Sequence, residues 1–215
     1  MSIATIVIGE SGTGKSTSMR NMDPAETLLI QTVKKPLPFR SSNWKPVKDG
    51  GNVIVTPDWQ RIIQACQKTQ RKVIVIDDFQ YLLATEFMDR ANETGFQKFT
   101  DLALHAWEVF SAVNKLPDDV RVYILSHTQT DDMGHTKFKT LGKLLDEKIT
   151  VEGLFSIVLR THVEGGNYTF RTQNSGSDTV KSPMGLFEGS SIDNDLAAVD
   201  AAICDYYGLT SEEAA

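Results

Sequence analysis

A glycine-rich segment near the start of the chain constrains its fold more than any other feature. Residues 9–16 read Gly-Glu-Ser-Gly-Thr-Gly-Lys-Ser and match the phosphate-loop (Walker A) pattern G-x-x-x-x-G-K-[ST] at every fixed position. An apolar run at 3–8 precedes the segment and a helix is expected at 16–21, so the strand–loop–helix context is present. Glycines let the backbone curl until successive N–H groups point at phosphate oxygens. We therefore expect a phosphate site formed by Gly9, Glu10, Ser11, Gly12, Thr13, Gly14, Lys15, Ser16 and Thr17.

Two side chains of this loop and one acid further along predict a site for ATP and Mg²⁺. Lys15 would neutralise the β- and γ-phosphates, and the hydroxyl of Ser16 would bind Mg²⁺. The helix at 16–21 would direct its positive end at the phosphates. The run Val-Ile-Val-Ile-Asp at 73–77 carries Asp77 to the C-terminal end of a buried strand. Open α/β sheets bind ligands at that edge, so Asp77 is expected to hold Mg²⁺, directly or through water.

The acid that follows, Asp78, has two interpretations. A second carboxylate beside the metal ligand can orient the attacking water, which would make Asp78 a catalytic residue. Alternatively, Asp78 caps the helix that comes after it. The two interpretations carry equal weight from sequence alone, and Glu10 is the next candidate for the catalytic base.

Polar residues also end the strand expected at 121–127. They form the run Ser126-His127-Thr128-Gln129. At that edge of the sheet a polar side chain can contact the γ-phosphate and respond to its loss, and His127 is the candidate that we name for this role. The alternative is that His127 is an ordinary structural hydrogen-bonding group, and Thr128 or Gln129 takes the role.

The order of elements predicts an α/β fold with a doubly wound, mostly parallel sheet. Apolar runs indicate strands at 3–8, 27–32, 52–55, 72–77 and 121–127. Helices are expected at 16–21, at 56–70 with Thr56 as its cap, and at 85–115 with a break near Gly95. Residues 154–163 and 167–172 predict a C-terminal antiparallel hairpin turned by Gly165-Gly166, followed by a loop at 174–191 and an amphipathic helix at 193–207. We expect one domain over residues 1–215.

Composition limits the location and the partners of the chain. The 215 residues carry a net charge of -6, with 40% hydrophobic and 23% charged residues, as in ordinary globular proteins. The chain has no apolar stretch long enough to span a membrane and begins without a signal peptide, so we expect a cytoplasmic protein. Cys66 and Cys204 lie in apolar contexts and are expected to be buried thiols.

One loop is positively charged, although the chain as a whole carries a net negative charge. Residues 33–51 are rich in proline and poor in periodic apolar residues, which predicts a long loop. Cations contact a nucleic-acid backbone and aromatic rings stack on unpaired bases, so the loop is a candidate site for single-stranded DNA. The alternative is a solvated loop whose two aromatic side chains pack on the core. The relevant residues are Lys34, Lys35, Phe39, Arg40, Trp44, Lys45 and Lys48.

A further cation is a candidate for catalysis between subunits. Lys181 lies in the glycine- and serine-rich loop after the hairpin. In rings and filaments, a neighbouring subunit's cation can stabilise the transition state of phosphoryl transfer. This interpretation predicts a homo-oligomer with hydrolysis that depends on assembly; the alternative is that Lys181 is an ordinary surface charge.

The phosphate loop, the strand ending Ile-Asp-Asp at 76–78 and the strand Ile-Leu-Ser-His-Thr-Gln at 124–129 resemble the RecA-like P-loop core. The segments at 99–101, 116–119, 139–148, 180–185 and 192–196 resemble bacteriophage ATP-binding proteins of that class. The resemblance implies ATP hydrolysis, single-stranded DNA and a role in phage recombination, annealing or replication. It also implies a single-stranded-DNA-binding protein as partner and the bacterial host cytoplasm as location.

This chain departs from the RecA pattern at one position. The strand at 27–32 ends in Gln31-Thr32 where RecA-type proteins usually carry a catalytic glutamate, so hydrolysis is slow or Asp78 or Glu10 substitutes. The competing hypothesis for function is an ATP-dependent regulator or assembly factor that acts on a protein rather than on DNA. Burial of Phe39 and Trp44 against the core would favour it.

Overall fold

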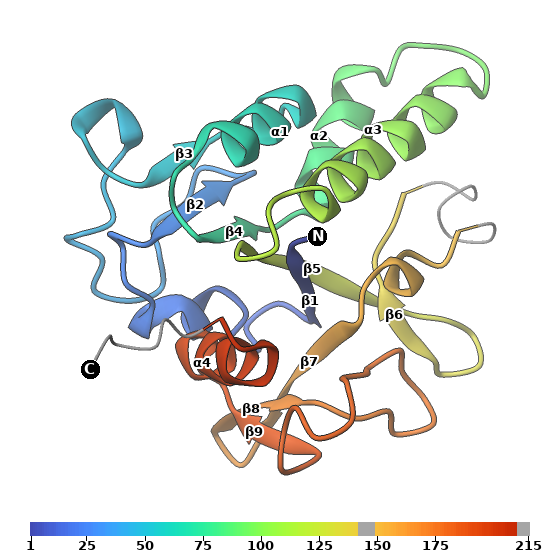
Figure 1. The fold of residues 1–215 in the computed structure, drawn as a ribbon. Helices are drawn as coiled ribbons and strands as arrows, with labels where there is room; N and C mark the ends of the chain where they lie inside the picture. Colours follow the sequence, from blue (N-terminus) through green and yellow to red (C-terminus); the bar gives the residue numbers. More distant parts are fainter. Residues whose placement is uncertain (142–148, 210–215) are drawn as a thin grey trace.

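The computed structural model describes residues 1–141 and 149–209, so the expectations for 142–148 and 210–215 lie outside it. It contains a nine-stranded sheet, in which eight strands follow the order β3-β2-β4-β5-β1-β7-β8-β9 and β6 pairs with β5 (Figure 1). The strands are β1 Ile3–Gly9, β2 Thr27–Gln31, β3 Val53–Val55, β4 Val73–Asp77, β5 Arg121–Thr130, β6 Thr136–Phe138, β7 Ile157–Glu164, β8 Asn167–Arg171 and β9 Ser191–Asp193. The helices are α1 Trp59–Lys68, α2 Gln80–Asp89, α3 Gln97–Asn114 and α4 Leu196–Tyr207, with 3-10 turns η1 Ser16–Asn21, η2 Val47–Asp49 and η4 Val151–Leu154.

The strand order confirms the predicted fold class. The six strands in the order β3-β2-β4-β5-β1-β7 run parallel. Strands β8 and β9 add antiparallel pairs at one edge, and β6 pairs antiparallel with β5. The strand that leads into the phosphate loop, β1, lies between β5 and β7, and β5 separates it from β4. This arrangement brings the carboxyl ends of β1, β4 and β5 to one edge of the sheet.

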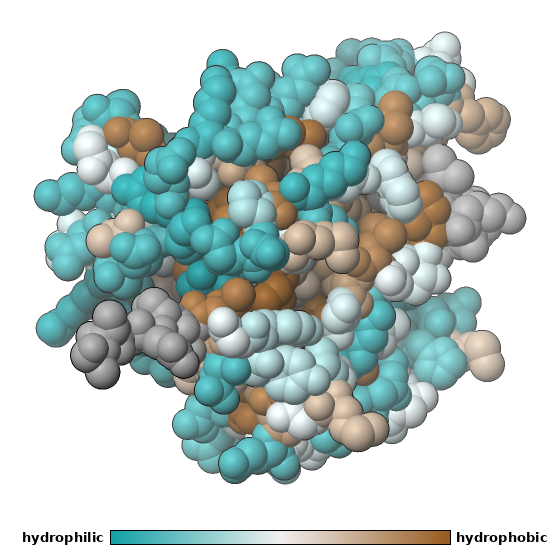
Figure 2. Space-filling model, viewed as in Figure 1, coloured by the Kyte–Doolittle hydropathy of each residue, from teal (hydrophilic) through white to brown (hydrophobic). Residues whose placement is uncertain are grey.

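Helices cover both faces of this sheet, as a doubly wound fold requires (Figure 1). Alternate residues of β1 enter different cores: Ile6 and Ile8 join the cluster under α1, α2 and α3, and Val7 joins the cluster under α4. The predicted apolar stripe of the last helix is confirmed, because Leu196 and Val199 of α4 are fully buried. Figure 2 shows apolar residues gathered between α4 and the layer of α1–α3, whereas hydrophilic residues cover the outer surface of that layer.

Several predicted boundaries were wrong for identifiable reasons. The segment after the phosphate loop forms the 3-10 turn η1, not a regular α-helix, so little helix dipole points at the phosphates. Helix α1 is capped by Asp58, whose carboxylate accepts hydrogen bonds from the Gln60 and Arg61 N–H groups, and not by Thr56. Strand β9 was missed because three residues carry too little pattern to be recognised.

The predicted hairpin of β7 and β8 is confirmed, with Gly165 and Gly166 at φ of 57° and 82° in its turn. Positive φ at both central residues is the geometry that favours glycine in a two-residue hairpin. Cys66 is buried as expected, but Cys204 is partly exposed. In the described part of the chain, no helix is long and apolar enough to cross a membrane.

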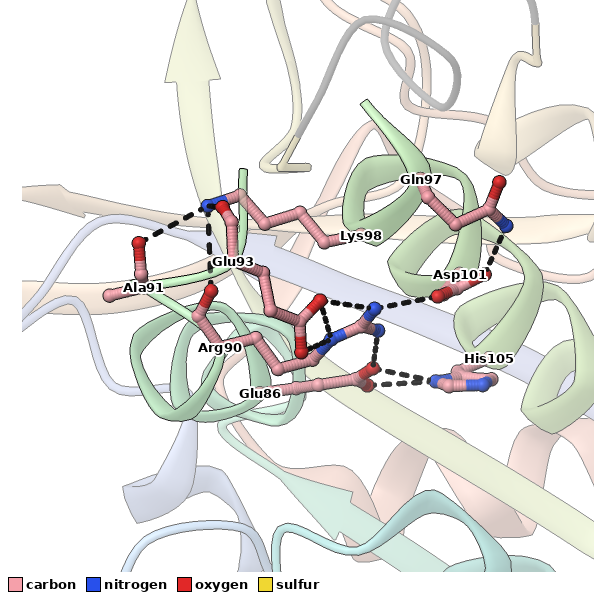
Figure 3. Close-up of polar contacts among 8 residues, drawn as sticks. All are labelled: Glu86, Arg90, Ala91, Glu93, Gln97, Lys98, Asp101 and His105. Carbon is pink, nitrogen blue, oxygen red and sulfur yellow. Dashed lines mark hydrogen bonds and ion pairs between the residues drawn. The ribbon is translucent and has the colours of Figure 1, made fainter. Parts of the chain in front are cut away.

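A cluster of charged groups holds helices α2 and α3 together (Figure 3). Arg90, at the end of α2, contacts Glu86 at 3.1 Å, Glu93 at 2.8 Å and Asp101 of α3 at 2.7 Å. His105 lies 2.9 Å from Glu86 through its Nδ1 atom. The cluster therefore links the end of α2 to the first turns of α3.

Candidate functional site

The phosphate loop forms a backbone cradle around a buried lysine. Gly12 and Gly14 adopt φ of 79° and 96°, which turns the loop tightly between β1 and η1. Lys15 is only 6% exposed, and its Nζ donates hydrogen bonds to the carbonyl oxygens of Gly9 at 2.8 Å and Glu10 at 2.7 Å. Burial lowers the pKa of Lys15 to about 8, although Asp78 and Asp77 oppose the shift. An incoming phosphate would therefore meet a partly desolvated cation.

The C-terminal third of the chain packs directly against this loop. A Cβ atom on Gly9 would lie 1.8 Å from Thr161 Oγ1, so only glycine fits between the loop and β7. The hydroxyls of Thr13 and Thr161 are hydrogen-bonded at 2.6 Å. On the other side, a Cβ atom on Gly14 would lie 3.0 Å from the amide oxygen of Asn194. These contacts fix the loop in place.

Ser16 and Asp77 form the pair that the sequence predicted. The Ser16 hydroxyl donates to the Asp77 carboxylate, with distances of 2.8 and 3.0 Å to its two oxygens. Asp77 is fully buried at the end of β4. Burial raises the pKa of Asp77 to about 6, and Asp78 adds to the shift. Lys35 and Lys15 oppose this rise only in part, so the Asp77 carboxylate would gain from a further cation nearby.

Asp78 is held in a conformation that aims its carboxylate at the cradle. It has a φ of 61° and is the one non-glycine residue with positive φ in the described ranges 1–141 and 149–209. Such strain is typical of functional sites. Its carboxylate forms an ion pair with Lys35 and lies 3.7 Å from His127 Nε2. Burial alone would raise the pKa of Asp78, but His127 and Lys35 together lower it.

The alternative role of Asp78 as a helix cap is wrong. Phe79 occupies the N-cap position of α2, and no side chain caps that end. The Asp78 backbone instead accepts a hydrogen bond from Thr32 Oγ1 at 2.6 Å, which ties it to the end of β2.

Lys35 belongs to this site, whereas the sequence placed it in a DNA loop. It follows β2, whose residue Gln31 pairs in register with Asp77, and the Gln31 amide donates to the Lys35 carbonyl at 3.3 Å. The ion pair with Asp78 outweighs desolvation and raises the pKa of Lys35. The signal available in the sequence was that Lys35 lies only four residues after the end of β2, the strand beside β4.

His127 is the member of its run that reaches the site. It lines the cavity and meets the ring of Tyr81 edge-on, with centroids 6.1 Å apart. Thr128 and Gln129 lie further along β5, where they pair with β6. The strand was predicted to end at 127, but pairing with β6 extends it to Thr130.

These groups surround a cavity of about 190 Å³ at the carboxyl edge of the sheet. Its lining consists of Ser11, Gly12, Gly14, Lys15, Ser16, Thr17, Lys35, Pro38, Asp78 and His127. Most of the predicted site residues are therefore brought together. Glu10, the second candidate base, is exposed and lies outside this lining.

A second, larger cavity of about 580 Å³ begins at the same loop. Gly12 and Thr17 line both cavities. The remaining lining comes from η1, the hairpin turn and the start of α4, namely Arg20, Gly166, Asn167, Tyr168, Asp193, Asn194 and Asp195.

Lys181 is not brought to this site. Its backbone N–H and carbonyl are hydrogen-bonded to Val158 of β7 at 3.0 and 2.8 Å. The segment is therefore anchored to the sheet at this position, and the role of the Lys181 side chain at a neighbouring subunit's site stays a prediction. Lys181 is absent from the lining of both cavities.

The other predicted DNA-binding residues at 33–48 fall into two groups, the aromatic rings and the exposed cations. Phe39 and Trp44 pack on the core under α4 and meet edge-on with ring centroids 6.0 Å apart, so neither is a free stacking platform. The cations outside the cavity are exposed at Lys34, Arg40, Lys45 and Lys48.

Comparison with known proteins gives distant matches among solved structures alone. No protein-family model matches the chain, and no curated protein matches it. Among solved structures, it is similar at 12% identity and a TM-score of 0.44 to a chain of "The Structure Of A DnaB-Like Replicative Helicase And Its Interactions With Primase". The match covers 79% of this chain and 51% of that chain, so this chain spans about half of its length.

Proposed function

We propose that this protein is a Mg²⁺-dependent ATPase. One observation carries the proposal: Lys15, the Ser16–Asp77 pair and Asp78 converge on a single phosphate-sized cavity at the edge of the sheet. Each group has the chemistry that phosphoryl transfer requires, namely a cation for the phosphates, hard oxygens for the metal and a carboxylate for the water.

Ser16 and Asp77 fit Mg²⁺. Both offer oxygen ligands, and the buried Asp77 carboxylate would gain a cation that the protein itself supplies only in part. The described residues contain no cluster of three or more His, Cys, Asp or Glu that could hold a metal, which agrees with a cation bound mainly by phosphates and water. When bound, Mg²⁺ would neutralise charge that develops on the phosphates.

The protein groups then have separate tasks in hydrolysis. Backbone N–H groups of the loop and Lys15 hold the β- and γ-phosphates, while Asp78 orients a water in line with the γ-phosphorus. The water oxygen bonds to phosphorus, the bond to the β–γ bridging oxygen breaks, and the released proton passes by way of Asp78 to solvent. His127 and Lys35 lower the pKa of Asp78, so its carboxylate stays ionised and can accept a hydrogen bond from the water.

The second cavity is the place we propose for the nucleoside. A chain of phosphates in the first cavity would continue past Gly12 and Thr17 into it. There the half-exposed ring of Tyr168 offers a face for the base.

Asp78→Asn should lower turnover by about a hundredfold or more while ATP affinity changes little. Asparagine tolerates positive φ, so the backbone at this position should keep its conformation. Steady-state turnover and equilibrium ATP binding measure the two effects. If turnover is unchanged, the water is oriented by another group, and Glu10→Gln is the variant to compare next.

For the wider role, we propose that the protein binds single-stranded DNA as a homo-oligomer in phage recombination, annealing or replication. The exposed cations and the absence of any acid over 33–48 support contact with a polyanion. The packing of Phe39 and Trp44 on the core supports the second candidate, a regulator or assembly factor whose partner is a protein.

Salt dependence separates these two roles. Binding to single-stranded DNA should weaken as salt rises, and replacing Lys34, Arg40 and Lys45 by alanine should reduce the slope by about one unit for each lost contact. Trp44→Ala should change affinity less than a base-stacking residue would. DNA affinity that is equal in wild type and the triple variant would exclude this segment and favour the protein-partner role.

A further inference from the structure

We propose that Lys35 binds the terminal phosphate of the nucleotide from within its own chain. The inference rests on the proposed ATPase function and assigns a second phosphate-binding cation that the phosphate-loop motif does not contain. It replaces the expectation that such a cation comes from Lys181 of a neighbouring subunit.

The position of Lys35 supports this role first. It lines the same cavity as Lys15, Ser16 and Thr17, and it lies on the segment that leaves β2 rather than on the phosphate loop. The hydrogen bond from Gln31 to its carbonyl fixes its backbone beside β4. Its side chain remains 39% exposed, so the ammonium group can move without breaking a packed core.

The charges in the cavity give the second argument. Asp78 lines the space in which a triphosphate would place further negative charge, and the buried Asp77 carboxylate accepts a hydrogen bond from Ser16, which also lines it. Lys15 is committed to the loop side, where the β-phosphate would bind. Lys35 is the cation on the side of Asp78, where the attacking water and the terminal phosphate would meet.

An exchange of partners follows from this arrangement. With ADP, Lys35 stays paired with Asp78. With ATP, a γ-phosphate oxygen competes for the same ammonium group, and the carboxylate of Asp78 becomes free to accept a hydrogen bond from water. A merely structural ion pair between Lys35 and Asp78 would instead be indifferent to the γ-phosphate.

The ratio of ADP to ATP dissociation constants tests the assignment. In Lys35→Ala this ratio should fall by about tenfold, because a charge-assisted contact to the γ-phosphate is lost while ADP affinity is retained. Lys35→Gln, which keeps most of the stem, should behave in the same way. Lys68→Ala is the matched control, since Lys68 is exposed at the end of α1 and should leave the ratio unchanged.

These measurements distinguish failure of the Lys35 assignment from failure of the ATPase proposal. If wild type binds neither nucleotide, the ATPase proposal and this inference both fall. If wild type hydrolyses ATP but both Lys35 variants keep the ratio of Lys68→Ala, only the role of Lys35 is overturned. Mixing Lys35→Ala with Lys15→Ala should not restore turnover; restored turnover would show that the cation acts between subunits and would overturn the assignment within one chain.

Discussion

Replacing Lys15 by alanine should weaken ATP binding by about two orders of magnitude or more, because it removes the buried cation at the centre of the phosphate cradle. In the structure, Lys15 Nζ donates hydrogen bonds to the carbonyl oxygens of Gly9 and Glu10. The variant therefore loses both the phosphate contact and an internal link of the loop. Equilibrium binding of ATP with Mg²⁺ measures the loss.

Two controls make this result specific. Lys68→Ala removes a lysine of equal charge from an exposed site and should bind ATP as wild type does. Thermal unfolding of Lys15→Ala should show an intact fold, since the cores on both faces of the sheet do not include Lys15. Wild-type affinity in Lys15→Ala would mean that the cavity is not a phosphate site.

Asp77→Asn should make the protein more stable and at the same time remove its response to Mg²⁺ and ATP. Burial raises the pKa of Asp77 from 3.8 to about 6, so ionising this group in the folded state costs free energy that the unfolded chain does not pay. The amide keeps an acceptor for Ser16 and removes the charge. At pH 7.5 without ligands, the variant should be more stable by an amount on the order of 1–3 kcal/mol.

The extra stability of Asp77→Asn should depend on pH in a direction that follows from the raised pKa of Asp77. The cost develops as pH rises from 3.8 to about 6, so the advantage of Asp77→Asn should be full above that window and vanish below it. Thermal unfolding at pH 4 and pH 7.5 measures the difference. Added Mg²⁺ and ATP should stabilise wild type but not the variant, because a neutral amide is a poor ligand for a hard cation. A variant that is less stable at pH 7.5 and still responds to Mg²⁺ would contradict both claims.

The parts of the site that were predictable from sequence are those coded by local pattern. The phosphate loop, the apolar strand before Asp77 and the glycine turn of the hairpin each require particular residue types at fixed spacing. The strands β1, β2 and β4 were accordingly placed within one residue. Their parallel pairing followed from the alternation of strands and helices, whereas their order in the sheet was not predicted.

The parts that were missed depend on contacts between distant segments. Lys35 enters the cavity because β2 pairs in register with β4, and no local pattern encodes that pairing. The strained backbone of Asp78 is likewise imposed by its neighbours, including the hydrogen bond from Thr32. For Phe39 and Trp44 the sequence allowed either stacking on bases or packing on the core, and both rings pack on the core.

The contacts of Thr161 and Asn194 with the phosphate loop have a consequence for how this chain tolerates change. Nucleotide-binding loops of this kind are often treated as portable units of one strand and one helix. Here the loop has only a short 3-10 turn behind it, and its shape depends on glycines that accommodate side chains from residues about 150 to 180 positions away. Substitutions in β7 or before α4 would therefore register as altered nucleotide affinity, far from any recognisable motif.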